Sequence, residues 1–244
     1  MCKKQTIENL IIVPGHGIYL GNGNWSGTFL APLYEERLLL EEHIRAGVNA
    51  AKNDSNALLI FSGGQTRDVP VSEAGSYYRW ATENLDIDLL SGRLVLEQYS
   101  RDSFENLAFS IHRYFHFTNS WPKRISVYGY IFKKKRFVFH AETLKKEPVR
   151  FWLEKNFDFD FHYEGVNNPI DEILNCKIDA DGKKIWGSRK WEEYTLKLFQ
   201  SEKKVDQEGL ATKRANRDIY CNGNPYFGDR RPINSYAYPP REEE

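Results

Sequence analysis

The chain has 244 residues, and its 34 basic and 34 acidic side chains leave no formal net charge at pH 7. This length fits one large α/β domain. Because a neutral chain has no overall field to attract nucleic acid or an anionic membrane, we expect neither as a partner. No stretch reaches the roughly 18 consecutive apolar residues of a membrane helix, and the first residues lack the apolar core of a signal peptide.

Three cysteines, Cys2, Cys176 and Cys221, lie far apart in the sequence. Their odd number and wide spacing match neither a disulfide framework nor a zinc site. Cysteines used so sparingly are typical of a reducing compartment, so we expect a cytoplasmic protein.

The first two thirds of the chain predict strands and helices in alternation. Short apolar runs, typical of parallel strands buried on both faces, alternate with segments that carry an apolar stripe at helical spacing. We expect strands at residues 10–13, 58–61, 93–96, 124–128 and 157–163, and helices at 34–52, 72–84 and 102–117. Apolar residues alternate in the last strand, which predicts an edge position. Together these elements predict an α/β fold with a Rossmann-like, doubly wound, mainly parallel sheet of about five strands.

The following segment is less regular. Two short runs at residues 176–178 and 184–186 flank a predicted turn at 179–182, and a helix is expected at 190–200. The turn begins Asp-Ala-Asp-Gly but lacks the further acidic positions of a calcium loop, so we interpret it as a turn only.

From residue 201 the chain becomes polar and rich in Gly, Asn and Pro, yet it keeps several tyrosines and arginines. We therefore divide the chain into an α/β domain, residues 1–200, and a C-terminal arm, residues 201–244. Because a solvated tail is poor in aromatics, we expect the arm to pack on the domain near the strands at 124–128 and 157–163. Its last residues are expected to fray.

Three polar turns follow predicted strands and open onto the same edge of the sheet, at residues 13–17, 61–66 and 99–106. Ligands bind at the carboxyl ends of the strands in an open parallel sheet, where backbone N–H groups and helix N-termini are exposed. We therefore expect a ligand site formed by Gly15, His16, Gly17, Ser62, Gly63, Gly64, Gln65, Thr66, Asp102, Ser103, Glu105 and Asn106.

The first of these turns is superficially similar to a dinucleotide-binding fingerprint. That fingerprint requires a helix directly after its glycines, whereas here a loop with Trp25 continues to Pro32. No acid follows the second strand to bind a ribose. We therefore reject NAD binding and interpret the loop as a flap over the site.

The second turn contains Ser62, Gly63 and Gly64. A serine nucleophile elbow requires glycine two residues before the serine, where this chain has Ile60. We interpret the two glycines as a backbone cradle for an anion or carboxylate, with further donors from the next two side chains. A plain turn after a strand is the alternative.

The third turn begins a helix. Asp102 and Glu105 have the spacing of a capping box, so capping alone explains this pair as well as ligand binding does. Capping leaves Ser103 and Asn106 to face a ligand.

Cationic side chains cluster after the fourth predicted strand. Lys133, Arg136 and His140 lie on one side at helical spacing, near the same edge of the sheet. With Arg37 they are expected to offset the charge of a phosphate or carboxylate. A solvated surface is the usual alternative for such a run.

His16, Glu73 and Glu105 are the candidate acid/base groups, because they are predicted at this edge. His112 and His116 form a histidine pair one helical turn apart, which is more typical of a surface helix than of a metal site. We therefore expect no metal.

The order of these motifs resembles the YdcF-like family, also described as SanA-like or ElyC-like. The resemblance spans residues 9–165 and rests on Glu36-Arg37, Ser62-Gly63-Gly64, Ser72-Glu73-Ala74 and residues 102–106. The stretches 132–140 and 210–217 are similar to the eukaryotic, particularly fungal, branch. The resemblance implies a Rossmann-like domain with a small-molecule site at the edge of the sheet. In some relatives it implies S-adenosylmethionine as the ligand and in others a role in envelope maintenance, with no settled reaction.

Two functions are consistent with these patterns. The first is an enzyme or binding protein for an anionic, nucleotide-like or S-adenosylmethionine-like small molecule. The alternative is a noncatalytic interaction or scaffold protein with a vestigial pocket, whose arm docks a partner. Polar residues gathered at three separate strand ends favour the first.

Overall fold

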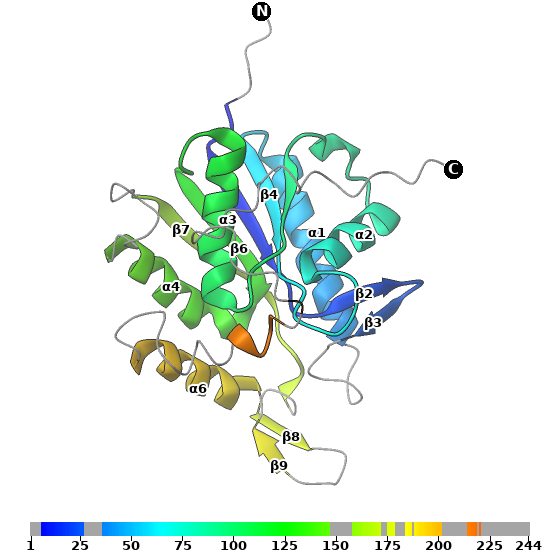
Figure 1. Ribbon diagram of the computed structural model, residues 1–244, viewed down its shortest axis with the longest axis vertical. Coiled ribbons are helices and arrows are strands. Elements are labelled where there is room, and N and C mark those ends of the chain that lie inside the picture. The colour runs from blue at the N-terminus through cyan, green and yellow to red at the C-terminus, as the bar shows by residue number, and fades with distance from the viewer. Residues whose placement is uncertain are drawn as a thin grey trace, which may run out of the picture.

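The computed structural model describes residues 6–26, 36–146, 158–171, 175–178, 184–186, 188–201, 214–218 and 220. Its centre is a five-stranded parallel sheet of order β5-β4-β1-β6-β7 (Figure 1). The strands are β1 (Asn9–Pro14), β4 (Ala57–Ser62), β5 (Leu94–Glu97), β6 (Arg124–Tyr130) and β7 (Asp160–Asn167). The predicted Rossmann-like fold is confirmed, and β7 lies at the edge where the alternating pattern placed it.

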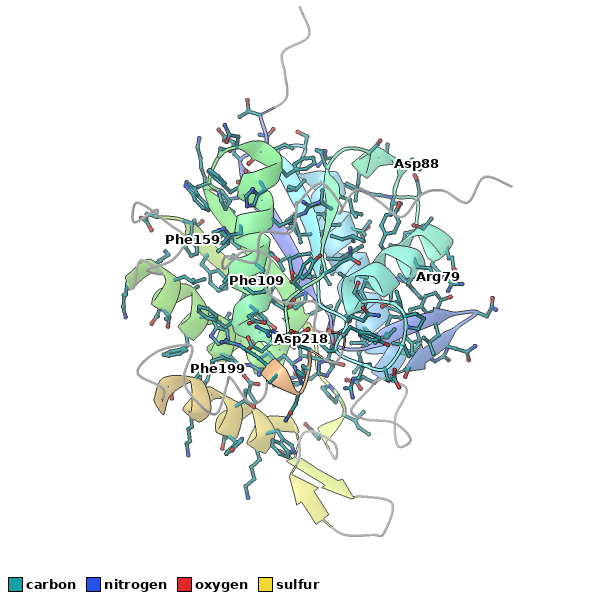
Figure 2. All side chains as sticks on the ribbon, in the orientation of Figure 1. Arg79, Asp88, Phe109, Phe159, Phe199 and Asp218 are labelled. Carbon is teal, nitrogen blue, oxygen red and sulfur yellow. The ribbon has the colours of Figure 1, made fainter. Side chains whose placement is uncertain are left out.

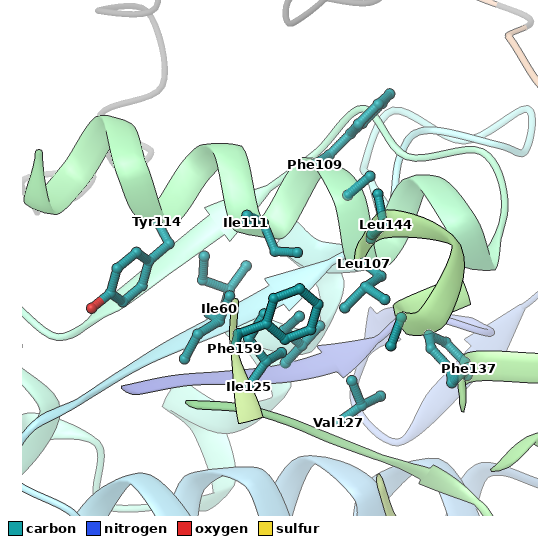
Figure 3. Packing of buried hydrophobic residues seen from close by; sticks show 14 of the residues in the cluster. Ile60, Leu107, Phe109, Ile111, Tyr114, Ile125, Val127, Phe137, Leu144 and Phe159 are labelled. Atoms are coloured by element: carbon teal, nitrogen blue, oxygen red, sulfur yellow. The ribbon is translucent and has the colours of Figure 1, made fainter. Parts of the chain in front are cut away.

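Helices cover both faces of the sheet: α1 (Glu36–Asn53) and α2 (Glu73–Asn84) on one, α3 (Ser103–Thr118) and α4 (Lys134–Lys146) on the other. An apolar core lies on each face of the sheet, and successive β1 side chains pack alternately into one and the other. Leu10 and Ile12 face α3, whereas Ile11 and Val13 face α1. Figure 3 shows the core beneath α3. Period-two alternation between two apolar cores explains why the central strands are continuous apolar runs. None of the described helices is long and apolar enough to cross a membrane.

Two side-chain caps, of which the one at Asp102 was predicted, fix where helices begin at the carboxyl edge of the sheet. The Ser72 hydroxyl accepts from the Gly75 N–H at 2.9 Å. Asp102 accepts from the N–H groups of Phe104 and Glu105 at 2.9 and 3.0 Å. Both are N-caps that satisfy donors left open at a helix start.

Residues 18–26, expected to be part of a loop, form an antiparallel hairpin. Its strands are β2 (Ile18–Gly21) and β3 (Asn24–Ser26). Asn22 and Gly23 connect them with positive φ angles of 51° and 76°, as a two-residue hairpin turn requires. The prediction of a loop was wrong over this part, because the Asn-Gly dipeptide favours a tight turn that pairs the flanking residues as strands. Residues 27–32 of the expected flap lie outside the described residues.

Other elements lie beyond the sheet. Two short helices, η1 (Asp88–Leu90) and η2 (Ile131–Lys133), precede β5 and α4. The two short runs that flank the predicted turn form the antiparallel strand pair β8 (Cys176–Ile178) and β9 (Lys184–Trp186). The turn between them lies outside the described residues. The predicted helix is α6 (Ser188–Ser201).

The described part of the C-terminal arm contacts the start of α3 (Figure 1, orange). Arg214 donates to Asp102 at 2.8 Å and approaches Glu105 at 3.1 Å, and all three side chains are buried. Arg217 donates to the backbone carbonyl of Arg101 at 2.7 Å. These contacts are with the loop after β5 and the first turn of α3, and the expected packing beside β6 and β7 stays a prediction for the rest of the arm. Two buried acids at this helix start explain the position, since they need a cation. Residues 202–213 and 221–244 lie outside the described residues.

Candidate functional site

A cavity of about 500 Å³ opens at the carboxyl ends of the strands. The chain runs from β1 to β4 and β5 on one side of the sheet and then crosses to β6 and β7, so the order reverses between β1 and β6. His16, after β1, and Lys133, after β6, face the cavity from the two sides of this point. Open α/β sheets bind their ligands at such a topological switch point.

Four side chains form a continuous hydrogen-bonded chain on the cavity wall. Nδ1 of His16 lies 3.0 Å from Nζ of Lys133, and its Nε2 lies 3.2 Å from Oε1 of Glu36. Tyr130 donates to the same Glu36 oxygen at 2.8 Å. Because a carboxylate only accepts, the ring proton of His16 belongs on Nε2. Nδ1 of His16 is then left to accept from Lys133.

The surroundings of these hydrogen-bonded side chains change the pKa values of two of them, His16 and Lys133. Burial, aided by the charge of Lys133, lowers the pKa of His16 to about 4. Burial, aided by the charge of Arg136, lowers the pKa of Lys133 to about 7. At neutral pH the imidazole of His16 is therefore uncharged, and Lys133 gives up its proton far more readily than an ordinary lysine does. A cavity lysine in this state serves as a base or a nucleophile.

Glu73, the first residue of α2, lies on the same wall. The Thr66 hydroxyl donates to its Oε1 at 2.7 Å. Burial is the main cause of the raised pKa of Glu73. The cavity therefore contains a carboxyl that holds its proton at higher pH than an ordinary glutamate does.

Two glycines make room for Glu73. A Cβ on Gly15 would lie 2.5 Å from the Cβ of Glu73, and one on Gly63 would lie 2.7 Å from it. Such distances are far below van der Waals contact. The ends of β1 and β4 therefore require glycine so that the first turn of α2 can pack between them.

The amide groups of these turns do not form the predicted anion cradle. The N–H groups of Gly15, Gly63 and Gly64 donate to the carbonyls of Ser62, Glu97 and Ser100 at 2.6, 2.9 and 2.8 Å. Bonds within the protein thus use the donors that the cradle would need. The physical reason for these glycines is close packing, so the cradle interpretation was wrong.

Replacing Gly15 with Ala is expected to lower the free energy of unfolding by about 1–3 kcal/mol, because the new methyl overlaps Glu73. Urea denaturation measures the loss. In a Glu73→Gly background the overlapping Cβ is gone, so the same substitution should cost markedly less. Equal losses in both backgrounds would contradict the contact.

Ser62 belongs to a buried polar cluster behind the cavity. Its hydroxyl lies 2.6 Å from Oε2 of Glu97 and 3.0 Å from Oδ1 of Asn106. The other Glu97 oxygen accepts from the N–H groups of Tyr99 and Ser100 at 2.6 and 3.0 Å. Burial raises the pKa of Glu97 to about 7. This cluster ties the ends of β4 and β5 to α3, and Ser62 itself does not line the cavity.

The two glutamates predicted as acid/base groups differ in position. Glu73 lines the cavity, whereas Glu105 is engaged by Arg101 at 2.8 Å and by Arg214 at 3.1 Å. Burial and the neighbouring Asp102 raise the pKa of Glu105. Its Oε2 accepts from the N–H of Arg101, one residue before the cap, so the predicted capping box does not close on Asp102. Glu105 anchors the arm and does not face a ligand.

Of the predicted site residues, those lining the cavity are Gly15, His16, Thr66, Glu73, Asp102, Ser103, Asn106, Lys133 and Arg136. Those that do not line it are Gly17, Arg37, Ser62, Gly63, Gly64, Gln65 and Glu105. Arg37 is half-buried on α1, and Gln65 donates to the Val69 carbonyl. Arg136 pairs with Glu192 of α6 at 2.7 Å. His140 lies behind the wall, where its Nε2 is 2.9 Å from the Ser103 hydroxyl.

The sequence prediction missed several cavity residues, including Glu36, His43, Arg67, Arg101, Tyr130, Phe132, Trp191 and Arg217. Glu36 had a usable signal, since it begins a helix after the first glycine turn. Trp191 had none. It reaches the cavity because Phe199 docks α6 into the core beside α4 (Figure 2). His43 packs on the Tyr130 ring at 4.5 Å, and its burial lowers its pKa to about 3.

The fold and the cavity define a Rossmann-like α/β protein with a pocket, lined by charged and aromatic side chains, at the switch point of its sheet. The chain is similar to an uncharacterised protein of Saccharomyces cerevisiae, YOR238W, at 25% identity over 89% of this chain and 86% of that protein. No family model matches, so the resemblance to the YdcF-like family stays a prediction. No solved structure matches either.

Proposed function

We propose that the protein binds a small anionic organic molecule in this cavity and transfers a proton to or from it. The observation that carries the proposal is the hydrogen-bonded chain of Glu36, His16 and Lys133 at the switch point. Structural polar networks are common in cores, but this one ends on a lysine that faces a cavity of ligand size.

Positive charge on the wall supports an anionic ligand. Arg67, Lys133 and Arg217 all line the cavity. Their charges oppose the rise in the pKa of Glu73, so their fields converge on the same space. Guanidinium and ammonium groups arranged in this way suit a carboxylate or phosphate.

Aromatic side chains on the cavity wall support a ligand with a flat ring. Phe132, Trp191 and Tyr194 line the cavity, and about half of the surface of Trp191 and of Tyr194 is exposed (51% and 48%). A nucleotide combines a ring with an anion. S-adenosylmethionine, which the family resemblance implies, has an adenine and a carboxylate and belongs to the same proposed class.

The proton is handled by Lys133 and Glu73. As a free amine, Lys133 accepts a proton from the ligand, while His16 orients the amine through Nδ1 and is itself too weak a base at neutral pH. Glu73, which lines the same cavity and whose pKa burial raises, supplies a proton. Glu36 fixes the tautomer of His16 and is therefore a positioning residue.

Lys133→Met is expected to weaken the binding of ADP or S-adenosylmethionine by about tenfold to a hundredfold, as the loss of one charged hydrogen bond implies. Isothermal titration measures the affinities. Lys135→Met is the matched control, since Lys135 is exposed two residues away and does not line the cavity. Equal affinities for both variants would contradict the site. A wild-type protein that binds neither probe nor inorganic phosphate would favour the noncatalytic alternative.

A further inference from the structure

We infer that Lys133 is a nucleophile that forms an imine with a carbonyl group of the bound anion. The substrate class is then a small aldehyde or ketone that also carries a carboxylate or phosphate. This inference rests on the proposed function for the cavity and adds a covalent step to it.

The position of Nζ supports a nucleophilic role. Nζ of Lys133 lies 3.0 Å from the acceptor Nδ1 of His16, and it lies beside the rings of Tyr130 and Phe132 at 5.1 and 5.8 Å. Lys133 ends η2, so its backbone is held directly before α4. One N–H is directed at His16, which leaves the lone pair of the amine to point elsewhere. A fixed and partly desolvated amine is what imine formation requires.

The charge state of Lys133 differs from that of an ordinary lysine. Lys134 and Lys135 follow it directly, and both are exposed. At pH 7 an ordinary lysine is a free amine in about one molecule in three thousand. With its pKa lowered to about 7, Lys133 is a free amine in about half of the molecules.

The cavity also contains the proton donor that the step needs. Nζ of Lys133 attacks the carbonyl carbon, a C–N bond forms, and one proton moves from nitrogen to oxygen to give a carbinolamine. Glu73, with its raised pKa, protonates the carbinolamine hydroxyl, and the C–O bond breaks to release water. The product is a protonated imine, and its positive charge is balanced by the new Glu73 carboxylate. No oxidant or reductant is consumed.

Two arginines of the cavity wall can bind the anionic group of the substrate. Arg67 and Arg217 line the cavity and are not consumed by this chemistry. A carboxylate or phosphate bound by these guanidinium groups would hold the carbonyl carbon within the cavity that Lys133 faces. Because the cavity holds about 500 Å³, the substrate is small, comparable to a sugar phosphate or a mononucleotide.

Trapping with borohydride tests the imine on the full-length protein. Pyridoxal 5′-phosphate is the probe, since it combines an aldehyde, a ring and a phosphate. Pyridoxine 5′-phosphate, which has an alcohol in place of the aldehyde, is the matched compound for binding alone. After reduction, peptide mapping by mass spectrometry locates the adduct, and titration calorimetry measures binding of the alcohol.

We expect the adduct at Lys133 to exceed that at Lys134 or Lys135 by about tenfold or more at pH 7, with a pH profile that rises with a midpoint near 7. Lys133→Arg should lose this adduct, and Lys135→Met should keep it. Equal trapping at the three lysines, or trapping only above about pH 9, would overturn the imine. If pyridoxine 5′-phosphate binds while no adduct forms at Lys133, the imine fails and anion binding stands. If neither is observed, both fail.

Discussion

Arg214→Ala is expected to lower the free energy of unfolding by about 3–5 kcal/mol. The side chain is buried and pairs with Asp102 at 2.8 Å and with Glu105 at 3.1 Å. Its removal takes a cation away from two buried carboxylates, one of which caps α3. Chemical denaturation followed by circular dichroism measures the loss.

Arg124→Ala is the matched control. Arg124 also pairs with an acid, Asp160 at 3.4 Å, but its side chain is more than half exposed. An exposed ion pair contributes at most about 1 kcal/mol, so this variant should stay close to the wild type. Similar losses for the two arginines would mean that the C-terminal segment does not dock on α3 in solution.

Glu97→Gln is expected to stabilise the protein at pH 8 by about 3 kcal/mol and to have little effect at pH 4. Burial raises the pKa of Glu97 from 4.5 to about 7. Because the folded pKa exceeds the unfolded one, the wild type has a contribution to stability that is fully present below pH 4.5. That contribution is lost as the pH rises through about 7. Glutamine keeps a carbonyl acceptor for the backbone donors of Tyr99 and Ser100 without a charge to bury.

Urea denaturation of both proteins between pH 4 and 8 measures this difference. His16, His43 and His112, whose pKa values burial lowers, destabilise the folded state as the pH falls in both proteins, so their effects cancel in the comparison. The stability difference should therefore grow with pH. A difference that is constant across this range would show that Glu97 titrates with an ordinary pKa.

The hydrogen bonds of Glu97 and the ion pairs of Arg214 both hold segments that line the cavity. Glu97 and its partners fix the carboxyl ends of β4 and β5, and Arg214 fixes the segment that carries Arg217 to the wall. Figure 2 shows Asp218 of the same segment beside the start of α3, where it approaches Arg101 at 3.6 Å. Ligand binding and docking of the C-terminal segment are therefore expected to stabilise each other, since they share Arg217.

The sequence by itself determined the sheet, its edge strand and two helix caps. These are local properties: continuous apolar runs need two covered faces, and Ser72 and Asp102 bond to N–H groups within three residues. The Asn22-Gly23 turn is equally local, since this dipeptide by itself favours a two-residue hairpin turn.

Tertiary structure decided what the polar residues at the edge of the sheet do. The glycines admit Glu73, which depends on how α2 packs between two strand ends and not on the glycines' own neighbours. Glu105 became an anchor because Arg214, 109 positions later, folds back onto it. The pairing of His16 with Lys133 joins two strands that are adjacent only after the chain crosses the sheet. The charge states of this pair follow from burial, a property of the assembled cavity that no local pattern contains.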